Sequence, residues 1–427
     1  MGNRKVVSLF SGCGGLDLGF EGGFEVPAPC VNENIHPDWI AKITRPGWIR
    51  LVRNSFETVF ANDIKPSGQV VWSRFFGQQP WNRPSSTFVL ESIVDLVKKA
   101  EAGKGPLFGL KADVVTGGFP CQDFSLAGKR GGFQSKRNHN GKTNENGTTP
   151  TEESRGMLYY WMRKVIELVE PKCFVAENVK GLVSMEKVKS TIESDFQNVG
   201  AEGYLMVPAR VLRAPDFGIA QTRERVIFLG FNRAKLLPRA IRALESGAID
   251  PYPVQTHLVP IGKGTQRDLF ALDNLKPAVT VRKVLQGLGE PEEHPEDSTH
   301  QAYSRCKWYG RHCQGQTEVN LDGQGPTIRS EHHGNIEFRR LSRENVGRHI
   351  EELVEGKPQR RLSVRECARI QSFPDSLDLV VPNNGDGNGV SGSDGYKLVG
   401  NAVPPFLAYH IARRLEKLWP LLFGSKG

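Results

Sequence analysis

The residue with the clearest chemical potential in this chain is Cys121, in the stretch DVVTGGFPCQDFS at 113–125. The apolar run at 114–116 predicts a short buried strand that ends at two glycines and turns through Phe119 and Pro120. Ligands of open α/β sheets bind at the carboxyl ends of the strands. A thiol held in a stiff turn there is a candidate nucleophile, although an isolated cysteine is more often a small buried core residue.

A second candidate site precedes it. Residues 5–10 predict a strand that runs into the glycine turn SGCGG, and apolar residues at 16–20 begin a helix. A strand, a glycine turn and a helix form the usual start of a nucleotide-type cofactor site. Such a site needs an acidic residue at the end of the next strand, and Glu33 and Asp63 are both candidates. Asp63 is preferred because TVFAND at 58–63 is the better strand, which makes 33–57 an insertion.

The elements that must position these residues alternate along the chain. A helix is predicted at 155–170, and the strand at 173–176 delivers Glu177 and Asn178 at its carboxyl end. Further strands are predicted at 207–212 and 226–230. This alternation indicates a mostly parallel sheet with helices on both faces. The polar, basic stretch at 126–155 is either a disordered insertion or a lid that closes over nucleic acid.

The pattern changes after residue 235. Residues 240–340 are irregular and indicate a second domain of loops and short strands. Ser363 and Glu366 form a capping box that begins a helix. A flexible loop is predicted at 383–395, and two prolines after 403 begin a final helix.

Composition sets the class of protein. The chain has 427 residues, 38% hydrophobic and 24% charged, as in a soluble globular protein of two or three domains. No apolar run reaches the roughly 18 residues of a membrane helix, and the start is too short before its glycine turn for a secretory signal, so we expect a cytoplasmic protein. The net charge of +9 favours a polyanionic partner. Seven scattered cysteines without a C-x-x-C pair predict neither a disulfide framework nor a zinc ribbon.

Seven sequence blocks, in order and over nearly the whole chain, carry a resemblance: FSGCGGLDLGF (10–20), GGFPCQDFS (117–125), SRGMLYY (154–160), ENV (177–179), QTRERV (221–226), RECARIQSFPD (365–375) and GNAVPP (400–405). The chain resembles the DNA cytosine-5 methyltransferases that accompany bacterial restriction enzymes. The resemblance implies an α/β, Rossmann-like fold with a mixed seven-stranded sheet, dependent on S-adenosyl-L-methionine, and a smaller, irregular target-recognition domain. The implied division is 1–235 for the catalytic domain, 236–393 for the recognition domain, and 394–427 for a segment that returns to the catalytic domain.

The same resemblance implies the catalytic roles. Cys121 attacks C6 of cytosine, which makes C5 nucleophilic towards the methyl group of S-adenosyl-L-methionine. Glu177 hydrogen-bonds N3 and the amino group, and a raised pKa helps it to share a proton. Arg223 is expected at O2 of the base, although Glu177 and Arg223 could instead form a buried salt bridge. Arg225 and Gln221 are expected to hold the catalytic loop and the phosphate backbone. Ser125 is expected in that loop, which closes over a flipped cytosine.

For the cofactor, the resemblance implies contacts at the glycine turn, at two strand ends and at the start of the final helix. The implied residues are Phe10, Gly12, Gly15, Asp63, Ile64, Ile93, Pro120, Leu158, Asn401 and Val403. Asp63 matches the ribose acid, and Ile64 matches an adenine contact. The family usually has Gly-Asp-Ile at the next acid, where this chain has Glu91-Ser92-Ile93. The adenine contact through an aspartate is therefore missing or shifted.

The expected partner is double-stranded DNA, with a paired restriction endonuclease, no membrane and no metal, and the chain is expected to be a monomer. The cysteines and histidines at 306, 312, 313, 332 and 333 do not have the spacing of a structural zinc site. They are expected in DNA-facing loops, with Arg329, Arg339, Arg340 and Arg343 as phosphate or base contacts. Two alternatives stay open: an RNA methyltransferase of the same fold, and an inactive DNA-binding regulator. The irregular region at 240–360 favours duplex DNA over RNA.

Overall fold

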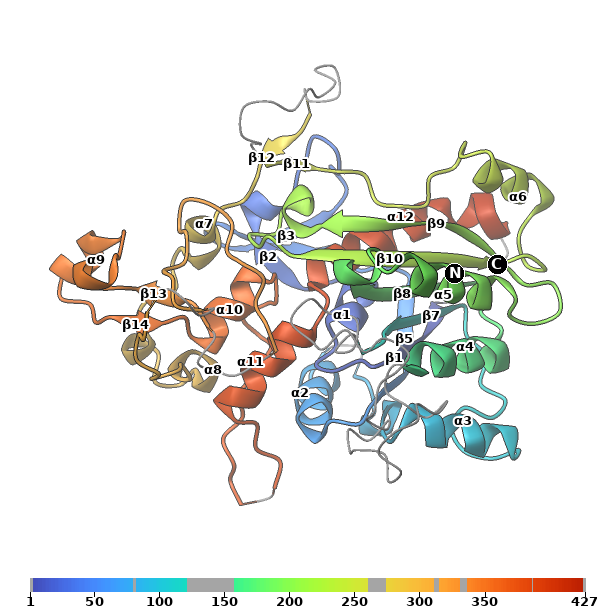
Figure 1. Ribbon diagram of the computed structural model, residues 1–427, viewed down its shortest axis with the longest axis horizontal. Helices are drawn as coiled ribbons and strands as arrows, with labels where there is room; N and C mark the ends of the chain where they lie inside the picture. Colours follow the sequence, from blue (N-terminus) through green and yellow to red (C-terminus); the bar gives the residue numbers. More distant parts are fainter. Residues whose placement is uncertain are drawn as a thin grey trace.

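The computed structural model describes residues 3–79, 82–120, 157–259, 274–310, 315–330, 336–385 and 387–424. A seven-stranded sheet forms the centre of the larger of two lobes (Figure 1). Across the sheet the strands are β6 (Phe88–Leu90), β5 (Phe56–Asp63), β1 (Arg4–Leu9), β7 (Val114–Gly118), β8 (Cys173–Val179), β10 (Glu224–Asn232) and β9 (Tyr204–Arg213). Pairing is parallel except along β10, which is antiparallel to both neighbours. This confirms the predicted mixed seven-stranded sheet.

Residues of these strands alternate between two cores, one on each face of the sheet. In β1, Val6 belongs to one core while Val7 and Leu9 belong to the other. In β7, Val114 and Val115 divide in the same way. Because side chains alternate along a strand, a strand buried on both faces has a continuous apolar run, which is why these strands could be recognised in the sequence.

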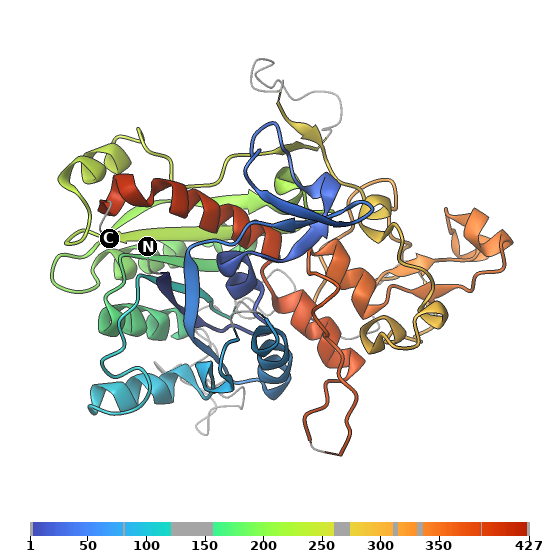
Figure 2. The same cartoon turned by 180° about the vertical axis from the view of Figure 1, so that it is seen from behind.

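Helices cover both faces of the sheet (Figures 1 and 2). One core includes residues of α3 (Ile93–Glu101), α4 (Leu158–Val169) and α5 (Glu186–Gln197). The other core includes residues of α1 (Gly15–Glu21), α2 (Pro66–Gly77), α6 (Pro238–Glu245) and the long α12 (Pro405–Phe423). Helix α12 packs against α1, so the end of the chain returns to the glycine turn where the sheet begins.

The order of the strands creates a switch point beside β1. From β1 the chain adds β5 and then β6 on one side, and later adds β7 and then β8 on the other. Connections therefore leave β1 and β7 in opposite directions, which opens a crevice at their carboxyl ends. The glycine turn follows β1, and the turn that leads to Cys121 follows β7.

The segment between α1 and β5, which begins before the insertion predicted at 33–57, forms a small antiparallel sheet of its own. Its strands are β2 (Glu25–Pro27), β4 (Trp48–Leu51) and β3 (Ile40–Arg45). Arg45 of this sheet pairs with Asp375 of the smaller lobe at 2.5 Å. A short parallel pair, β11 (His257–Leu258) and β12 (Lys276–Pro277), lies beside the insertion, where Asn32 donates to the carbonyls of Thr256 and Asn274.

The smaller lobe contains short elements joined by irregular chain. They are α7 (Val281–Leu285), α8 (Ser298–Gln301), β13 (Phe338–Arg340), α9 (Ile350–Val354), β14 (Arg360–Arg361), α10 (Val364–Ile370) and α11 (Gly392–Asn401). The predicted capping box is confirmed, since Ser363 and Glu366 exchange both bonds at the start of α10. The predicted end of the 383–395 loop is wrong, because α11 begins at Gly392 with Ser391 as its N-cap. Buried Tyr396, Leu398 and Val399 hold that helix in place.

Two helices, α6 and α11, pack differently from what the expected domain boundaries imply. Helix α6 packs against β9 and α12, and Arg414 of α12 donates to the carbonyl of Asp250. The chain beyond residue 235 therefore continues on the larger lobe. Helix α11 packs against both α10 and α2, so it joins the two lobes rather than belonging to one. In the described part of the chain, no helix is long and apolar enough to cross a membrane.

Candidate active site

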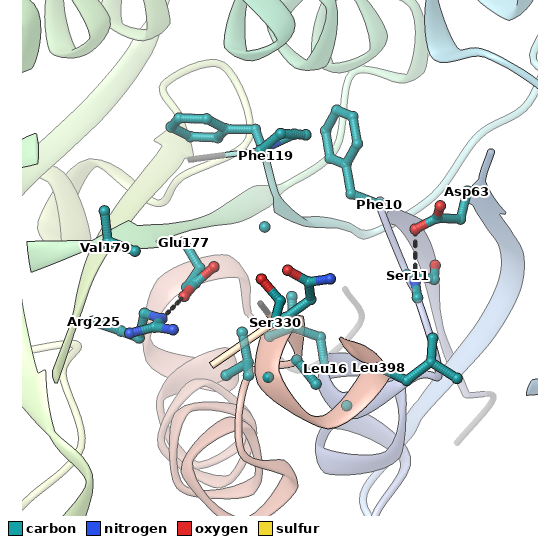
Figure 3. Close-up of a pocket in the computed structure, with 18 of the residues that line it drawn as sticks. Phe10, Ser11, Leu16, Asp63, Phe119, Glu177, Val179, Arg225, Ser330 and Leu398 are labelled. Carbon is teal, nitrogen blue, oxygen red and sulfur yellow. Dashed lines mark hydrogen bonds and ion pairs between the residues drawn. The ribbon is translucent and has the colours of Figure 1, made fainter. Parts of the chain in front are cut away.

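A cavity of about 1270 Å³ opens at the carboxyl ends of the central strands. Its walls come from the glycine turn after β1, the ends of β5, β7 and β8, residues 327–330 of the smaller lobe, and the junction between α11 and α12. Figure 3 shows Glu177 and Arg225 at one end and Asp63 at the other, with Phe10 and Phe119 along one wall. The switch point and both lobes thus contribute to one site.

The turn after β1 is built tightly against the end of the chain. Phe10 has a φ of 55°, an unusual value for a bulky residue, and its ring lines the cavity. A Cβ on Gly15 would lie 2.3 Å from the carbonyl oxygen of Val403. Only glycine lets the start of α1 approach the junction of α11 and α12 so closely.

Asp63 closes the same end of the cavity. Its carboxylate accepts hydrogen bonds from the backbone N–H groups of Gly12 and Lys65, each at 3.0 Å. Burial raises the pKa of Asp63, while Lys65 and these N–H groups act in the opposite direction. The strand β5 therefore delivers its terminal carboxylate to the glycine turn, as the preference for Asp63 over Glu33 predicted.

Glu177 occupies the other end. It lies in β8 and is 6% exposed, and its Oε1 is 2.6 Å from Nε of Arg225 in the neighbouring strand β10. Burial raises the pKa of Glu177, and the positive charges of Arg225 and Arg223 offset part of this effect. The buried carboxyl is therefore easier to protonate than an exposed glutamate and is held by one guanidinium.

The turn that leads to Cys121 is positioned by β8. Gly118 lies opposite Glu177 in the paired strands, and a Cβ on Gly118 would lie 2.8 Å from the Glu177 carboxylate. The side-chain amide of Asn178 donates to the carbonyl of Phe119 at 3.1 Å. The residues just before Cys121 are thus aligned on the strand that carries Glu177.

The comparisons with known proteins agree with this geometry. Residues 4–417 match the family described as C-5 cytosine-specific DNA methylase. The chain belongs to this family. Its activity is accordingly transfer of a methyl group to C5 of cytosine in DNA.

Individual relatives align over nearly the whole chain. The type II methyltransferase M.FnuDI of Fusobacterium nucleatum is 28% identical, over 97% of this chain and 94% of the relative. The type II methyltransferase M.BspRI of Lysinibacillus sphaericus is 30% identical, over 97% of this chain and 81% of the relative. Among solved structures, a putative DNA modification methyltransferase of an E. coli prophage has a TM-score of 0.53 at 17% identity, covering 98% of this chain and 99% of that one. This last likeness concerns the fold.

The ten residues that the family resemblance assigned to the cofactor all line the cavity: Phe10, Gly12, Gly15, Asp63, Ile64, Ile93, Pro120, Leu158, Asn401 and Val403. Of the six residues assigned to catalysis, Glu177 and Arg225 line it as well. Cys121 and Ser125 lie outside the described residues. Cavity-lining position supports these assignments, and their roles stay predictions.

Arg223 lies elsewhere, and its assignment to the base is corrected. Its side chain is 1% exposed and does not line the cavity. Its guanidinium donates to the carbonyls of Ile328, Gly400 and Ala402 at 3.2, 2.9 and 2.8 Å. The methylase uses Arg223 to bind the smaller lobe and the α11–α12 junction to the sheet, and Arg225 is the arginine that faces Glu177.

Gln221 is also buried away from any phosphate contact, and its expected contact with the catalytic loop stays a prediction because that loop lies outside the described residues. Gln221 is fully buried and donates to the side chain of Gln371, which in turn donates to the carbonyls of Val399 and Ala402. Gln371 and Arg223 thus meet at the carbonyl of Ala402. We call Gln221, Arg223 and Gln371 the lobe clamp. Gln371 was not singled out in the sequence, although it stands in the block RECARIQSFPD.

Two of the arginines expected to contact DNA are structural. Arg340 is fully buried and pairs with Glu290 and Glu352, and Arg339 pairs with Glu352 at 2.8 Å. Arg329 lines the cavity, and Arg343 is exposed. Of the cysteines and histidines weighed as zinc ligands only Cys306 is described, and the described residues contain no group of three metal-ligating side chains.

Proposed function

We propose that this methylase is sequence-specific, that it takes its methyl group from S-adenosyl-L-methionine, and that it acts on a cytosine flipped out of duplex DNA. One observation carries the proposal. A single cavity holds a buried carboxyl–guanidinium pair at one end and a strand-end carboxylate with a glycine turn at the other. The first arrangement suits a polar base edge, and the second suits a ribose.

The cofactor fits the end formed by Phe10, Gly12, Asp63 and Ile64. Asp63 keeps acceptor capacity for ribose hydroxyls beyond its two backbone bonds. Ile64 is 45% exposed and offers an apolar surface to an aromatic ring. When bound, S-adenosyl-L-methionine supplies an electrophilic methyl group on a sulfonium. The cavity volume of about 1270 Å³ exceeds the range usual for one small ligand and leaves room for a base.

Cys121 is the nucleophile in this proposal. Pro120 lines the cavity, and Cys121 follows it in the sequence. The thiolate forms a bond to C6 of cytosine, and the electron pair of the C5–C6 double bond then takes the methyl group at C5. The methyl–sulfur bond would break in that transfer, with its electron pair left on sulfur in a neutral thioether. A base removes the C5 proton, the double bond re-forms, and the thiolate leaves.

The four buried cysteines among the described residues are poor candidates for this step. Burial raises the pKa of Cys13 and Cys30 to about 12, and it also raises the pKa of Cys173 and Cys367. A thiol attacks as its thiolate, so these four stay unreactive near neutral pH.

Glu177 and Arg225 stabilise the charge that develops on the ring. As the thiolate adds to C6, negative charge moves towards N3 and O2 of the base. A protonated Glu177 donates a hydrogen bond at N3, and its raised pKa favours that form. The Arg225 guanidinium, beside it at 2.6 Å, reaches O2. Arg225 thereby takes the role that the sequence assigned to Arg223.

Base flipping is proposed because the thiolate must reach C6 of the cytosine ring. In a duplex both faces of cytosine are stacked, so a thiolate cannot approach C6 unless the nucleotide leaves the helix. The cavity lies between two lobes and is deep enough to bury Glu177 to 6% exposure. We propose that Ser125 and its neighbours close over the flipped base.

The test begins with bisulfite sequencing of DNA from cells that express the chain, which identifies the methylated cytosine and its flanking bases. Cys121→Ala is expected to abolish methylation while the purified variant still binds the site. A duplex with 5-fluorocytosine at that position should form a covalent adduct with the wild type, because fluorine at C5 prevents elimination. Peptide mapping should place the adduct on Cys121. Full methylation by Cys121→Ala would refute the mechanism.

The RNA alternative is tested with labelled S-adenosyl-L-methionine and either DNA or tRNA, and transfer to tRNA alone would refute the DNA proposal. We also propose that the enzyme works as a cytoplasmic monomer beside a restriction endonuclease of the same specificity. The names of the type II relatives support this pairing. Methylated plasmid should resist an endonuclease that cuts the mapped site, and light scattering should give one chain of 47.4 kDa.

A further inference from the structure

The small antiparallel sheet that precedes β5 makes an aromatic and ionic contact with the smaller lobe. Trp48 begins β4 and is 5% exposed. The guanidinium carbons of Arg45 in β3 and Arg369 in α10 lie over its indole ring, 4.0 and 4.9 Å from the ring centroid. Both arginines also pair with Asp375, at 2.5 and 2.7 Å. We call Arg45, Trp48, Arg369 and Asp375 the tryptophan bracket.

The contacts of the tryptophan bracket suit a firm attachment. A guanidinium over an indole ring is attracted by the electrons of the ring, and the attraction is stronger where water is excluded. Arg369 donates two hydrogen bonds to the Asp375 carboxylate, each at 2.7 Å. It also donates to the carbonyl of Gln286, which follows α7, at 3.4 Å. Arg369 and Asp375 are therefore fixed within the smaller lobe.

The sheet that carries Trp48 is fixed to the larger lobe. Trp39 is 4% exposed and packs edge to face against Tyr409 of α12, with ring centroids 5.0 Å apart. Ile49 and Leu51 of β4 belong to the core on the same face of the main sheet. Figures 1 and 2 show this small sheet beside α7, where the smaller lobe begins. A shift of the smaller lobe would therefore have to break the tryptophan bracket.

The lobe clamp and the tryptophan bracket hold the same part of the smaller lobe. Gln371 of the clamp and Arg369 of the bracket lie two residues apart at the carboxyl end of α10. One attachment would leave the lobe free to rotate about it, whereas two attachments fix its orientation. Helix α10 contacts the segment that reaches the cavity, since a Cβ on Gly325 would lie 3.3 Å from Ile370. Residues 327–330 of that segment line the cavity.

We infer that Trp48 and Arg45 are positioning residues for duplex DNA. Through the end of α10 they fix the smaller lobe at the angle at which a duplex contacts both lobes. The inference rests on the proposed function, in which a base from the duplex enters a cavity lined by both lobes. Because the persistence length of DNA is about 150 base pairs, a short duplex does not bend easily to follow a misplaced lobe.

The inference separates the binding of DNA from the binding of the cofactor. None of the four residues of the tryptophan bracket lines the cavity. Loss of the bracket should therefore weaken the binding of duplex DNA. The affinity for the cofactor, and the rate of methyl transfer once the duplex is bound, should change little.

Arg45→Glu and Arg50→Glu form a matched test in the full chain. Both arginines belong to the small sheet, their side chains are 41% and 44% exposed, and both substitutions change the charge equally. Arg45→Glu places a carboxylate beside Asp375, whereas Arg50 pairs with Glu25 of the same sheet at 2.9 Å. Fluorescence anisotropy with a duplex that carries the mapped site should show about tenfold weaker binding for Arg45→Glu and no change for Arg50→Glu.

Two further measurements on the same variants distinguish positioning from a general loss of structure. Calorimetry gives the affinity for S-adenosyl-L-homocysteine, and single-turnover kinetics at saturating duplex give the rate of transfer. Both quantities should stay within about twofold of the wild type in Arg45→Glu, while the concentration of duplex needed for half the maximal rate rises about tenfold.

Trp48→Leu and Trp48→Phe test the aromatic part of the tryptophan bracket. Neither substitution changes the charge, so weaker binding of duplex DNA cannot come from a lost phosphate contact. Trp48→Leu should bind the duplex about tenfold more weakly, and Trp48→Phe, which keeps an aromatic ring for the guanidiniums, within about threefold of the wild type. Arg45 is more exposed than Trp48, so Arg45→Glu keeps the test decisive if Trp48→Leu does not fold.

Equal duplex affinities in Arg45→Glu and Arg50→Glu would overturn the inference, whether both fall or neither does. A fall in cofactor affinity as large as the fall in duplex affinity would overturn it as well, because the tryptophan bracket would then support the fold as a whole. Both results would leave the proposed function standing. A wild-type chain that binds S-adenosyl-L-homocysteine but neither binds nor methylates duplex DNA would overturn the proposed function, and this inference with it.

Discussion

At the scale of single residues, the active site depends on how closely Glu177 is enclosed. Gly118 lies opposite it in the sheet, Arg225 pairs with it, and water reaches only a small part of it. Each contact limits where the carboxyl group can point. Two predictions follow from this enclosure.

Gly118→Ala is expected to lower the rate of methyl transfer by roughly 10²-fold, because misplacing a catalytic group by about an ångström has that effect. The added Cβ would stand 2.8 Å from the Glu177 carboxylate, which must then move away from Arg225. Single-turnover kinetics measure the change. The matched control is Gly77→Ala at the end of α2, where the nearest atom is 3.7 Å away and the rate should be unchanged. Equal rates in both variants would contradict the proposed role of Glu177.

The pH dependence should report the protonation of Glu177. Burial raises its pKa, so the protonated form persists to higher pH than in an exposed glutamate. The contribution of the proposed hydrogen bond from Glu177 to N3 is therefore expected at low pH and is expected to be lost as pH rises through this raised pKa. Glu177→Gln, which cannot ionise, should be slower by roughly 10²-fold and should lack this alkaline decline. Single-turnover rates across the pH range measure it, and an identical decline in both proteins would assign it to another group.

At the scale of elements, the site exists because separate segments are held together by buried polar side chains. The lobe clamp of Gln221, Arg223 and Gln371 joins the start of β10 to residue 328 and to the α11–α12 junction. That junction includes Asn401 and Val403, which line the cofactor end of the cavity. A residue outside the cavity therefore controls its shape.

Arg223→Ala should accordingly weaken cofactor binding as well as the fold. We expect the dissociation constant of S-adenosyl-L-homocysteine to rise about tenfold and the unfolding free energy to fall by about 3 kcal/mol, because three carbonyls lose a charged donor. Calorimetry and urea unfolding measure the two effects. Arg239→Ala, on the exposed side of α6, is the control and should change neither. If Arg223→Ala lowered the unfolding free energy but left the affinity for S-adenosyl-L-homocysteine unchanged, the lobe clamp would stabilise the fold without shaping the cavity.

At the scale of the whole molecule, the smaller lobe is held by charge as well as by apolar packing. Arg340 and Arg360 share Glu290, Arg360 also pairs with Glu366, and Arg340 with Glu352. These side chains are largely buried, so each charge is stable only with its partners. Arg339 and Arg340, which were expected to contact DNA, are therefore held in ion pairs within the lobe.

Glu290 makes the stability of this lobe dependent on pH. Hydrogen bonds and charges from Arg340 and Arg360 outweigh burial and lower its pKa to about 2. An unfolded glutamate titrates near 4.3, so the stabilisation is fully present above about pH 4.3 and is lost as pH falls towards the folded pKa. Glu290→Gln should therefore lower the unfolding free energy by about 3 kcal/mol at neutral pH, and by less as the pH falls. Urea unfolding at several pH values measures this, with Glu355→Gln, in an exposed pair with Lys357, as the control.

Much of this protein was determined by its sequence alone. Buried strands with apolar runs, a glycine turn and a capping box are local patterns, and they correctly predicted the sheet, the place of Asp63 and the start of α10. Seven short blocks indicated the family, because their residues and their order can be recognised directly along the chain. The start of α11 was missed because glycine and serine signal a loop, while the buried Tyr396 and Leu398 that stabilise this helix act only after folding.

The tertiary structure alone decided which arginine meets Glu177. Arg223 and Arg225 are two residues apart, and in extended chain such side chains point to the same side. Their pattern therefore cannot distinguish them. The difference comes from what covers each one: residues 328 and 400–402, distant in sequence, close over Arg223, while Glu177 of the neighbouring strand meets Arg225. Partners of this kind are set by the packing of the two lobes, which no local pattern encodes.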